Sequence, residues 1–169
     1  MTQADGPTAP ARGRIVQLSV SPGGVPKLPI SAAEVTPLGL AGDDHHDTKH
    51  HGGPDAALCL YSAELISALR SEGHPIEPGS TGENVTLRGL DWNQMVPGAR
   101  LRFEGGVEIE ITQYTTPCAT IRASFLNGHV NRIKHALHPG WSRVYARVIA
   151  TGTLREGELV EILNSASQK

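Results

Sequence analysis

Cys118 is the residue of this chain that is best placed to do chemistry. It follows Thr115, Thr116 and Pro117, just after residues 107–112, where apolar and polar side chains alternate as they do in a strand. Thr116 suits the cap of a helix and Pro117 its first position, so the pattern predicts that a helix begins here. A helix start favours the thiolate, which can act as a nucleophile, a sulfur carrier or a soft-metal ligand. A buried structural cysteine is the alternative.

The second cysteine, Cys59, lies within the apolar residues 56–61. Apolar surroundings raise the pKa of a thiol and make it inert, so we interpret Cys59 as structural. The N-terminal residues 1–13 lack the charged start and apolar run of a secretion signal. The sequence therefore predicts a cytoplasmic protein with two reduced thiols.

Residues 43–55 form the densest polar cluster of the chain, with four histidines and four aspartates. Imidazoles and carboxylates at this density could hold zinc or iron, which would indicate a metal hydrolase. The alternative is a solvated loop whose side chains bond to their neighbours, because neither an H-E-x-x-H motif nor a paired cysteine spacing is present. The glycines after His51 also leave room for the backbone to approach a ligand closely.

Two further turns contain groups that could meet an anion. Thr81, Gly82, Glu83 and Asn84 form a polar turn whose N–H groups could cradle an oxyanion or a phosphate, or could simply lead into a strand. Lys27 stands in a proline-flanked loop that would hold an ammonium group in place, although a surface lysine is the commoner explanation.

The remaining segments predict the elements that must position these loops. A helix is expected from the cap residue Ser62 to about Glu72, ending at Gly73. Two short helical segments should follow Cys118. The 19 glycines and 12 prolines favour short strands joined by turns, so we predict a mainly β, β-rich α+β fold: a closed or nearly closed β-barrel with a few short helices. Strands are expected at residues 15–20, 34–36, 56–60, 84–87, 100–103, 107–112, 144–150 and 158–163, the last two as a closing hairpin.

The length of 169 residues favours one domain, residues 14–163, between a disordered lead-in of residues 1–13 and a flexible tail of residues 164–169. The net charge of −2, with both signs mixed along the chain, gives no reason to expect nucleic acid or a membrane surface as a partner. No apolar run approaches the roughly 20 residues of a membrane-spanning helix.

Taken together, these segments resemble the MOSC domain, which is named for the C-terminal domain of molybdenum-cofactor sulfurase. The matching segments occur in family order, from about Arg14 to Leu163, and the likeness is to stand-alone bacterial members of the YiiM type. The segments are Gly23 to Lys27, Gly39 to Asp43, His50 to Pro54, Thr81 to Asn84, Pro117 with Cys118, and Ala146 to Val148 with Gly152.

The resemblance implies a strand-rich barrel that binds a molybdopterin-type cofactor in a cleft. Cys118 would ligate molybdenum or carry a persulfide, and soft thiolate suits both roles. Lys27 would lie near the anionic part of the cofactor. The family is also associated with pyridoxal phosphate binding. The other residues that would line the pocket are His51, Gly52, Thr81, Gly82, Glu83 and Asn84.

Two arginines that are common in the family are missing here. Thr115 and Thr116 stand before the Pro-Cys pair, and Asp44 stands after Gly-Asp. Arg122 and Arg143 are candidates to supply the missing positive charge, and the sequence does not place either of them.

The resemblance favours a molybdenum-cofactor oxidoreductase that reduces small N-hydroxylated compounds, with Cys118 as catalytic metal ligand. Electrons would come from a separate reductase, because no flavin or nicotinamide motif is present. The alternative is a sulfur carrier or cofactor-handling protein, in which Cys118 takes a persulfide from a cysteine desulfurase.

Overall fold

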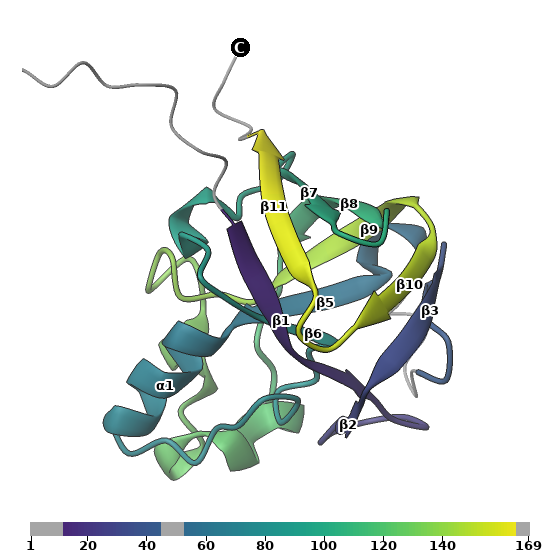
Figure 1. Cartoon of the computed structure of the whole chain (residues 1–169). Coiled ribbons are helices and arrows are strands. Elements are labelled where there is room, and N and C mark those ends of the chain that lie inside the picture. Colours follow the sequence, from purple (N-terminus) through teal and green to yellow (C-terminus); the bar gives the residue numbers. More distant parts are fainter. Residues whose placement is uncertain (1–11, 45–52, 165–169) are drawn as a thin grey trace, which may run out of the picture.

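The computed structural model describes residues 12–44 and 53–164 (Figure 1). Seven strands form a closed barrel, because β11 pairs with β7 on one side and with β1 on the other. A further short strand, β2 (Leu28–Ile30), pairs with the far end of β1. The predicted closed barrel is therefore confirmed. Around the barrel the strands run β1 (Arg12–Val20), β6 (Val85–Arg88), β5 (Leu58–Ser62), β9 (Val144–Ala150), β8 (Glu108–Tyr114), β7 (Arg100–Phe103) and β11 (Leu159–Asn164).

The pair β5–β6 is parallel, and α1 (Ala63–Ser71) belongs to the connection between these two strands. Ser62 caps α1 as predicted, since its Oγ accepts a hydrogen bond of 3.1 Å from the Leu65 N–H. Ile66 and Leu69 of α1 are buried, and Gly73 lies just beyond its end with a φ of +103°. The predicted helix is confirmed in position and in buried face.

A second sheet of three strands lies beside the barrel: β10 (Gly152–Arg155), β3 (Ala32–Thr36) and β4 (Gly39–Leu40). The chain leaves the barrel after β9, and β10 pairs with β3, placing Leu154 opposite Ala33. β9 pairs instead with β5 and β8, and β11 with β1 and β7. The predicted closing hairpin is therefore wrong, because β10 takes the chain to another sheet between the two strands.

The barrel interior is filled mainly by aliphatic side chains, as the aromatic content of 4% requires. β8 shows the alternation that the sequence predicts: Ile109 and Ile111 are buried, whereas Glu108 and Glu110 face outwards and pair with arginines of β7. Burial of one face of each strand stabilises the barrel through the hydrophobic effect.

The segment after Cys118 differs from the prediction. Cys118 itself is extended, and the residues that follow form short 3₁₀ helices rather than an α-helix beginning at Thr116. Phe125 returns to extended geometry, so no continuous helix can form. A 3₁₀ turn aligns few peptide dipoles, so the α-helix start that was expected to face the Cys118 sulfur does not form. The 3₁₀ helices are η1 (Pro54–Ala56), η2 (Trp92–Gln94), η3 (Ala119–Ser124), η4 (Leu126–Gly128) and η5 (Val130–Ile133).

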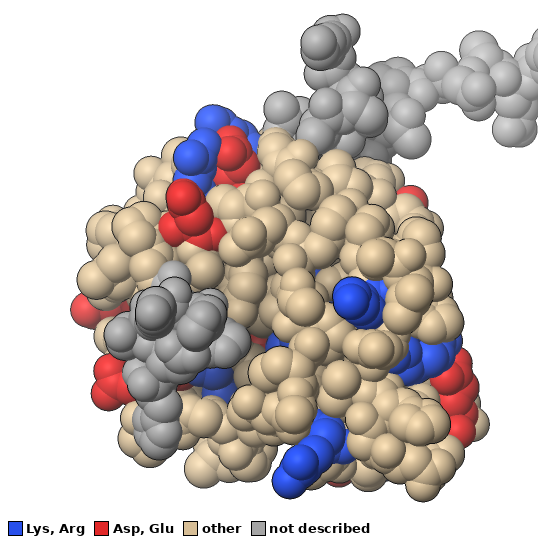
Figure 2. All heavy atoms as spheres, turned by 180° about the vertical axis from the view of Figure 1, so that it is seen from behind, with Lys and Arg blue, Asp and Glu red and all other residues tan. Residues whose placement is uncertain are grey.

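The face opposite to that of Figure 1 is mostly uncharged, with Lys and Arg side chains at separated positions and Asp and Glu towards the edges (Figure 2). Within residues 12–44 and 53–164, no helix is long and apolar enough to cross a membrane.

Candidate functional site

One cavity of about 260 Å³ brings together most of the predicted site residues. Lys27, Thr81, Gly82, Asn84 and Cys118 all line it, although they come from segments far apart in the sequence. Glu83 is fully buried beside them, and His51 and Gly52 lie outside the described residues. The remaining lining residues are Gly24, Val25, Asp44, Ala56, Cys59, Thr115, Thr116, Thr120, Ile121, Arg143 and Tyr145.

Cys118 is exposed and lies on the cavity lining, so its thiol is reachable from solvent. The strand β8 leads to it, and the backbone just before it is tied to the start of β9. Thr115 N–H donates to the Arg143 carbonyl at 3.0 Å, and Ser142 Oγ donates to the Thr115 carbonyl at 3.2 Å. These bonds fix the segment that presents the sulfur.

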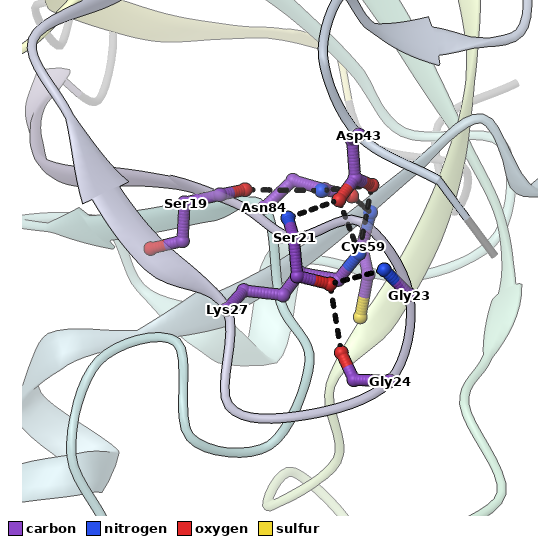
Figure 3. Close-up of polar contacts among 8 residues, drawn as sticks. All are labelled: Ser19, Ser21, Gly23, Gly24, Lys27, Asp43, Cys59 and Asn84. Carbon is purple, nitrogen blue, oxygen red and sulfur yellow. Dashed lines mark hydrogen bonds and ion pairs between the residues drawn. The ribbon is translucent and has the colours of Figure 1, made fainter. Parts of the chain in front are cut away.

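Lys27 and Asp43 form an ion pair at the cavity wall (Figure 3). The Lys27 ammonium lies 2.6 Å and 2.7 Å from the two carboxylate oxygens of Asp43. The side chains are only 6% and 3% exposed, so Lys27 is not the surface lysine that composition alone favours. Its charge is balanced by Asp43, which reduces what it can offer to an anionic ligand.

Asn84 joins this ion pair to two strands (Figure 3). Its Nδ2 donates to Asp43 Oδ2 at 2.8 Å and to the Ser19 carbonyl of β1 at 3.2 Å, and its Oδ1 accepts from the Cys59 N–H of β5 at 3.1 Å. The Ser21 N–H also donates to Asp43, at 2.9 Å. Asn84 therefore mainly stabilises the wall of the cavity through hydrogen bonds within the protein.

Arg143 is the cationic group that the sequence did not place. Its side chain is 5% exposed and lines the cavity, whereas Arg122 is exposed and lies outside the lining. The Arg143 Nη1 donates to the Thr81 carbonyl, and its buried Nε has no hydrogen-bond partner among the described residues. The one feature of the sequence that could have indicated Arg143 as a site residue is its position just before β9. Other arginines that flank strands share this feature.

The backbone before Arg143 is held by two aromatic donors. Tyr61 Oη donates to the Trp141 carbonyl at 2.6 Å, and Trp92 Nε1 donates to the Ser142 carbonyl at 2.8 Å. Both rings are buried. Their hydrogen bonds fix where Arg143 leaves the backbone.

Glu83 faces the same region as Arg143. The Thr81 hydroxyl donates to Glu83 Oε1 at 3.2 Å, while Glu83 Oε2 is buried without a partner in the described chain. Burial raises the pKa of Glu83, and the positive charge of Arg143 partly offsets this effect. Thr81 thus links two buried side chains of opposite charge.

Cys59 also lies on the cavity lining, but with 6% of its surface exposed. Burial raises the pKa of its thiol to about 11, against the opposing effect of Arg143. Its sulfur lies 4.0 Å from the Thr115 hydroxyl. These observations agree with the interpretation of Cys59 as an inert thiol.

The predicted metal cluster of residues 43–55 lies largely outside the described residues, because its four histidines fall within 45–52. Among residues 12–44 and 53–164, no group of three or more His, Cys, Asp or Glu side chains is arranged to hold a metal ion.

The protein is a mainly β barrel protein, and an exposed thiol lies on the lining of its ligand-sized cavity. The family model of the MOSC domain matches residues 47–161, and the chain belongs to the MOSC domain family. This confirms the resemblance that the sequence motifs carry.

Three relatives show how far the likeness extends. YflK of Bacillus subtilis is 29% identical over 73% of this chain, and YiiM of Escherichia coli is 28% identical over 79%. The aligned region spans 55% and 60% of those two proteins. A protein of Gibberella moniliformis named "Reductase" is 25% identical over 74% of this chain and 22% of its own length.

The crystal structure of YiiM from Geobacillus stearothermophilus superimposes with a TM-score of 0.69. The two chains are 23% identical, and the alignment covers 90% of this chain and 75% of the other. At this identity the likeness shows the fold alone.

Proposed function

We propose that this protein is a molybdenum-cofactor-binding oxidoreductase that reduces N-hydroxylated compounds. The observation that carries the proposal is the exposed Cys118 thiol on the lining of a cavity that also contains the Arg143 side chain. A soft ligand and a cation on one cavity match the two ends of a molybdopterin-type cofactor, a soft metal centre and an anionic group.

The residues present fit such a group. Cys118 would hold the metal through its sulfur. Arg143, whose buried Nε has no partner within the described part of the chain, would face the anionic part. The Lys27–Asp43 pair and Asn84 would keep the wall in shape. Bound there, the cofactor would supply the oxygen-transfer and electron-transfer chemistry that no protein side chain provides.

The cavity lining offers limited means of moving protons. Asp44 is the acidic residue of the described lining, and it is exposed to solvent. Tyr145 also lines the cavity, but burial raises its pKa to about 12, so it would donate a hydrogen bond rather than release a proton. We therefore assign proton supply to Asp44, and electrons to a separate reductase.

Metal and pterin analysis of protein made in a cofactor-competent host tests the proposal. Wild-type protein should contain molybdenum and pterin, and Cys118→Ser should lose most of the molybdenum. Cys59→Ser is the matched control, because it removes a sulfur from the same lining that is buried and should keep the metal. Wild-type protein without molybdenum, or Cys118→Ser with an equal amount, would refute the proposal.

The exposure of Cys118 favours one second candidate, a sulfur carrier. In this function the Cys118 thiolate would attack the outer sulfur of a desulfurase persulfide, so that the desulfurase thiol leaves and Cys118 keeps the transferred sulfur. Mass spectrometry after incubation with a cysteine desulfurase and free cysteine should then show one added sulfur atom that a reductant removes. A thiol that remains unmodified would exclude this candidate.

A further inference from the structure

Arg143 on the cavity lining and the fully buried Glu83 carry opposite charges, and the proposed function does not yet explain why Glu83 is there. The Arg143 guanidinium donates to the Thr81 carbonyl, and the Thr81 hydroxyl donates to Glu83. The pair is nevertheless incompletely bonded, because the Arg143 Nε and the Glu83 Oε2 are both buried without a partner in the described chain. Buried polar atoms are normally satisfied, so this arrangement needs an explanation.

The guanidinium has the properties of an oxyanion anchor. It has five N–H donors in a rigid plane, and one bond to Thr81 leaves capacity for a bidentate contact with a phosphate- or sulfate-like group. The same cavity is also lined by Thr116, Thr120 and Gly82, and Gly82 has a φ of +86° and no side chain that could block an approach. A buried arginine on such a lining suits an oxyanion such as phosphate or sulfate.

Glu83 opposes such a ligand when it is ionised, because its negative charge already balances Arg143. Other groups near Glu83 are Cys59 and Tyr61 of β5, whose titrations its charge affects. Burial raises the pKa of Cys59 to about 11 and that of Tyr61 further, so both stay neutral near neutral pH. Arg143 also affects the titration of Tyr145, which stays neutral because burial raises its pKa to about 12. Among these groups, Glu83 is therefore the one whose charge can change beside Arg143.

We propose that Arg143 anchors an oxyanion subsite in the cavity and that Glu83 makes this subsite proton-linked. The inference deepens the proposed function, since the bound group would be the anionic part of the cofactor. Because a bound anion and an ionised Glu83 repel each other, binding takes up a proton at Glu83. The affinity then falls as the pH rises, by at most about one decade per pH unit for one linked proton.

Titration calorimetry of the cofactor-free full chain with inorganic sulfate tests this inference between about pH 5 and pH 8. Hydrogen sulfate loses its proton well below this range, so sulfate stays a dianion throughout. Repeating the titration in two buffers of different ionisation enthalpy gives the number of protons taken up. Arg143→Gln should weaken sulfate binding by about tenfold or more, since a hydrogen bond to a charged group is lost. The matched control Arg122→Gln removes an equal charge from an exposed side chain outside the lining and should change little.

Glu83→Gln should bind sulfate more tightly at the upper end of this range, without a pH slope or proton uptake. Failure of folded wild-type protein to bind sulfate, equal effects of Arg143→Gln and Arg122→Gln, or an unchanged slope in Glu83→Gln would each overturn the inference. If Arg143→Gln does not fold, the comparison of proton uptake between wild type and Glu83→Gln tests the inference, and equal uptake by the two proteins would overturn it.

The outcomes separate this inference from the proposed function. Sulfate binding through Arg143 in a protein that never contains molybdenum would contradict the proposed function and leave the subsite standing. Wild-type protein that contains molybdenum, together with equal sulfate affinities of cofactor-free wild type and Arg143→Gln, would support the proposed function and contradict the subsite.

Discussion

Replacing Asp43 by alanine is the sharpest test of how the cavity wall is held. The Asp43 carboxylate accepts hydrogen bonds from the Lys27 ammonium, the Ser21 N–H and Asn84 Nδ2. Asp43→Ala removes all of these acceptors at once and leaves an ammonium group with 6% of its side chain exposed. We expect a large loss of stability from this single change.

The magnitude follows from the burial of the pair. Removing one partner of a buried ion pair costs about 3–5 kcal/mol, because the remaining charge is left uncompensated. Because Lys27 lies on the cavity lining rather than deep in the core, we expect a value near the lower end. Urea denaturation followed by circular dichroism at neutral pH should therefore show a free energy of unfolding lower by about 3 kcal/mol, with an unchanged m-value.

Two comparisons make the result decisive. The double variant Lys27→Met with Asp43→Ala should be less destabilised than Asp43→Ala alone, because it removes the uncompensated charge. Glu108→Ala breaks an exposed pair with Arg102 at 2.7 Å and should cost at most about 1 kcal/mol. A loss below about 1 kcal/mol for Asp43→Ala, or strict additivity with Lys27→Met, would refute the account of a buried, coupled pair.

Three other measurements probe the site and its support. Iodoacetamide should label folded protein once, at Cys118, because Cys59 is buried with a pKa of about 11; two adducts formed at equal rates would contradict this. Tyr61→Phe should lower the free energy of unfolding by about 1–3 kcal/mol, because the Trp141 carbonyl loses its donor, and urea denaturation that shows no change would exclude this role. Burial raises the pKa of Glu83, so the wild type loses stability as the pH rises from the usual glutamate pKa through the raised value. The stability of Glu83→Gln relative to wild type should therefore grow over that window in urea titrations, and a constant difference would contradict the assignment.

Local patterns predicted the strands well where one face is buried. The segments 100–103 and 144–150 were predicted with the bounds that the structure shows, because alternating burial leaves a direct trace in the sequence. The short strands β2, β4 and β10 were not predicted. β2 and β4 have three and two residues, too few to show a periodicity, and β10 has four residues that do not alternate in burial. The partners of β9 and of β11 also could not be predicted from local sequence. They depend on β10, which lies between these two strands in the chain and pairs with β3.

The residues of the candidate site were likewise predicted in part. Motif order led to Cys118 and to the turn of residues 81–84, and the structure places Cys118, Thr81, Gly82 and Asn84 on one cavity. The roles differ from those expected: Asn84 and the Lys27 pair mainly bond to the protein itself. Arg143 could be proposed but not placed, because its closeness to Thr81 arises only when β9 docks beside β5.

The seam between β1 and β11 has a consequence for how this protein is made. Arg14 of β1 lies opposite Leu159 of β11, so strands near the two ends of the described chain must meet to close the barrel. Contacts so distant in sequence form slowly, and during synthesis they must wait until the last strand has left the ribosome. The nascent chain therefore exposes β1 along one edge for most of its synthesis. An unpaired strand edge can pair with other chains, so shielding of the β1 edge until β11 arrives should raise the yield of finished barrel.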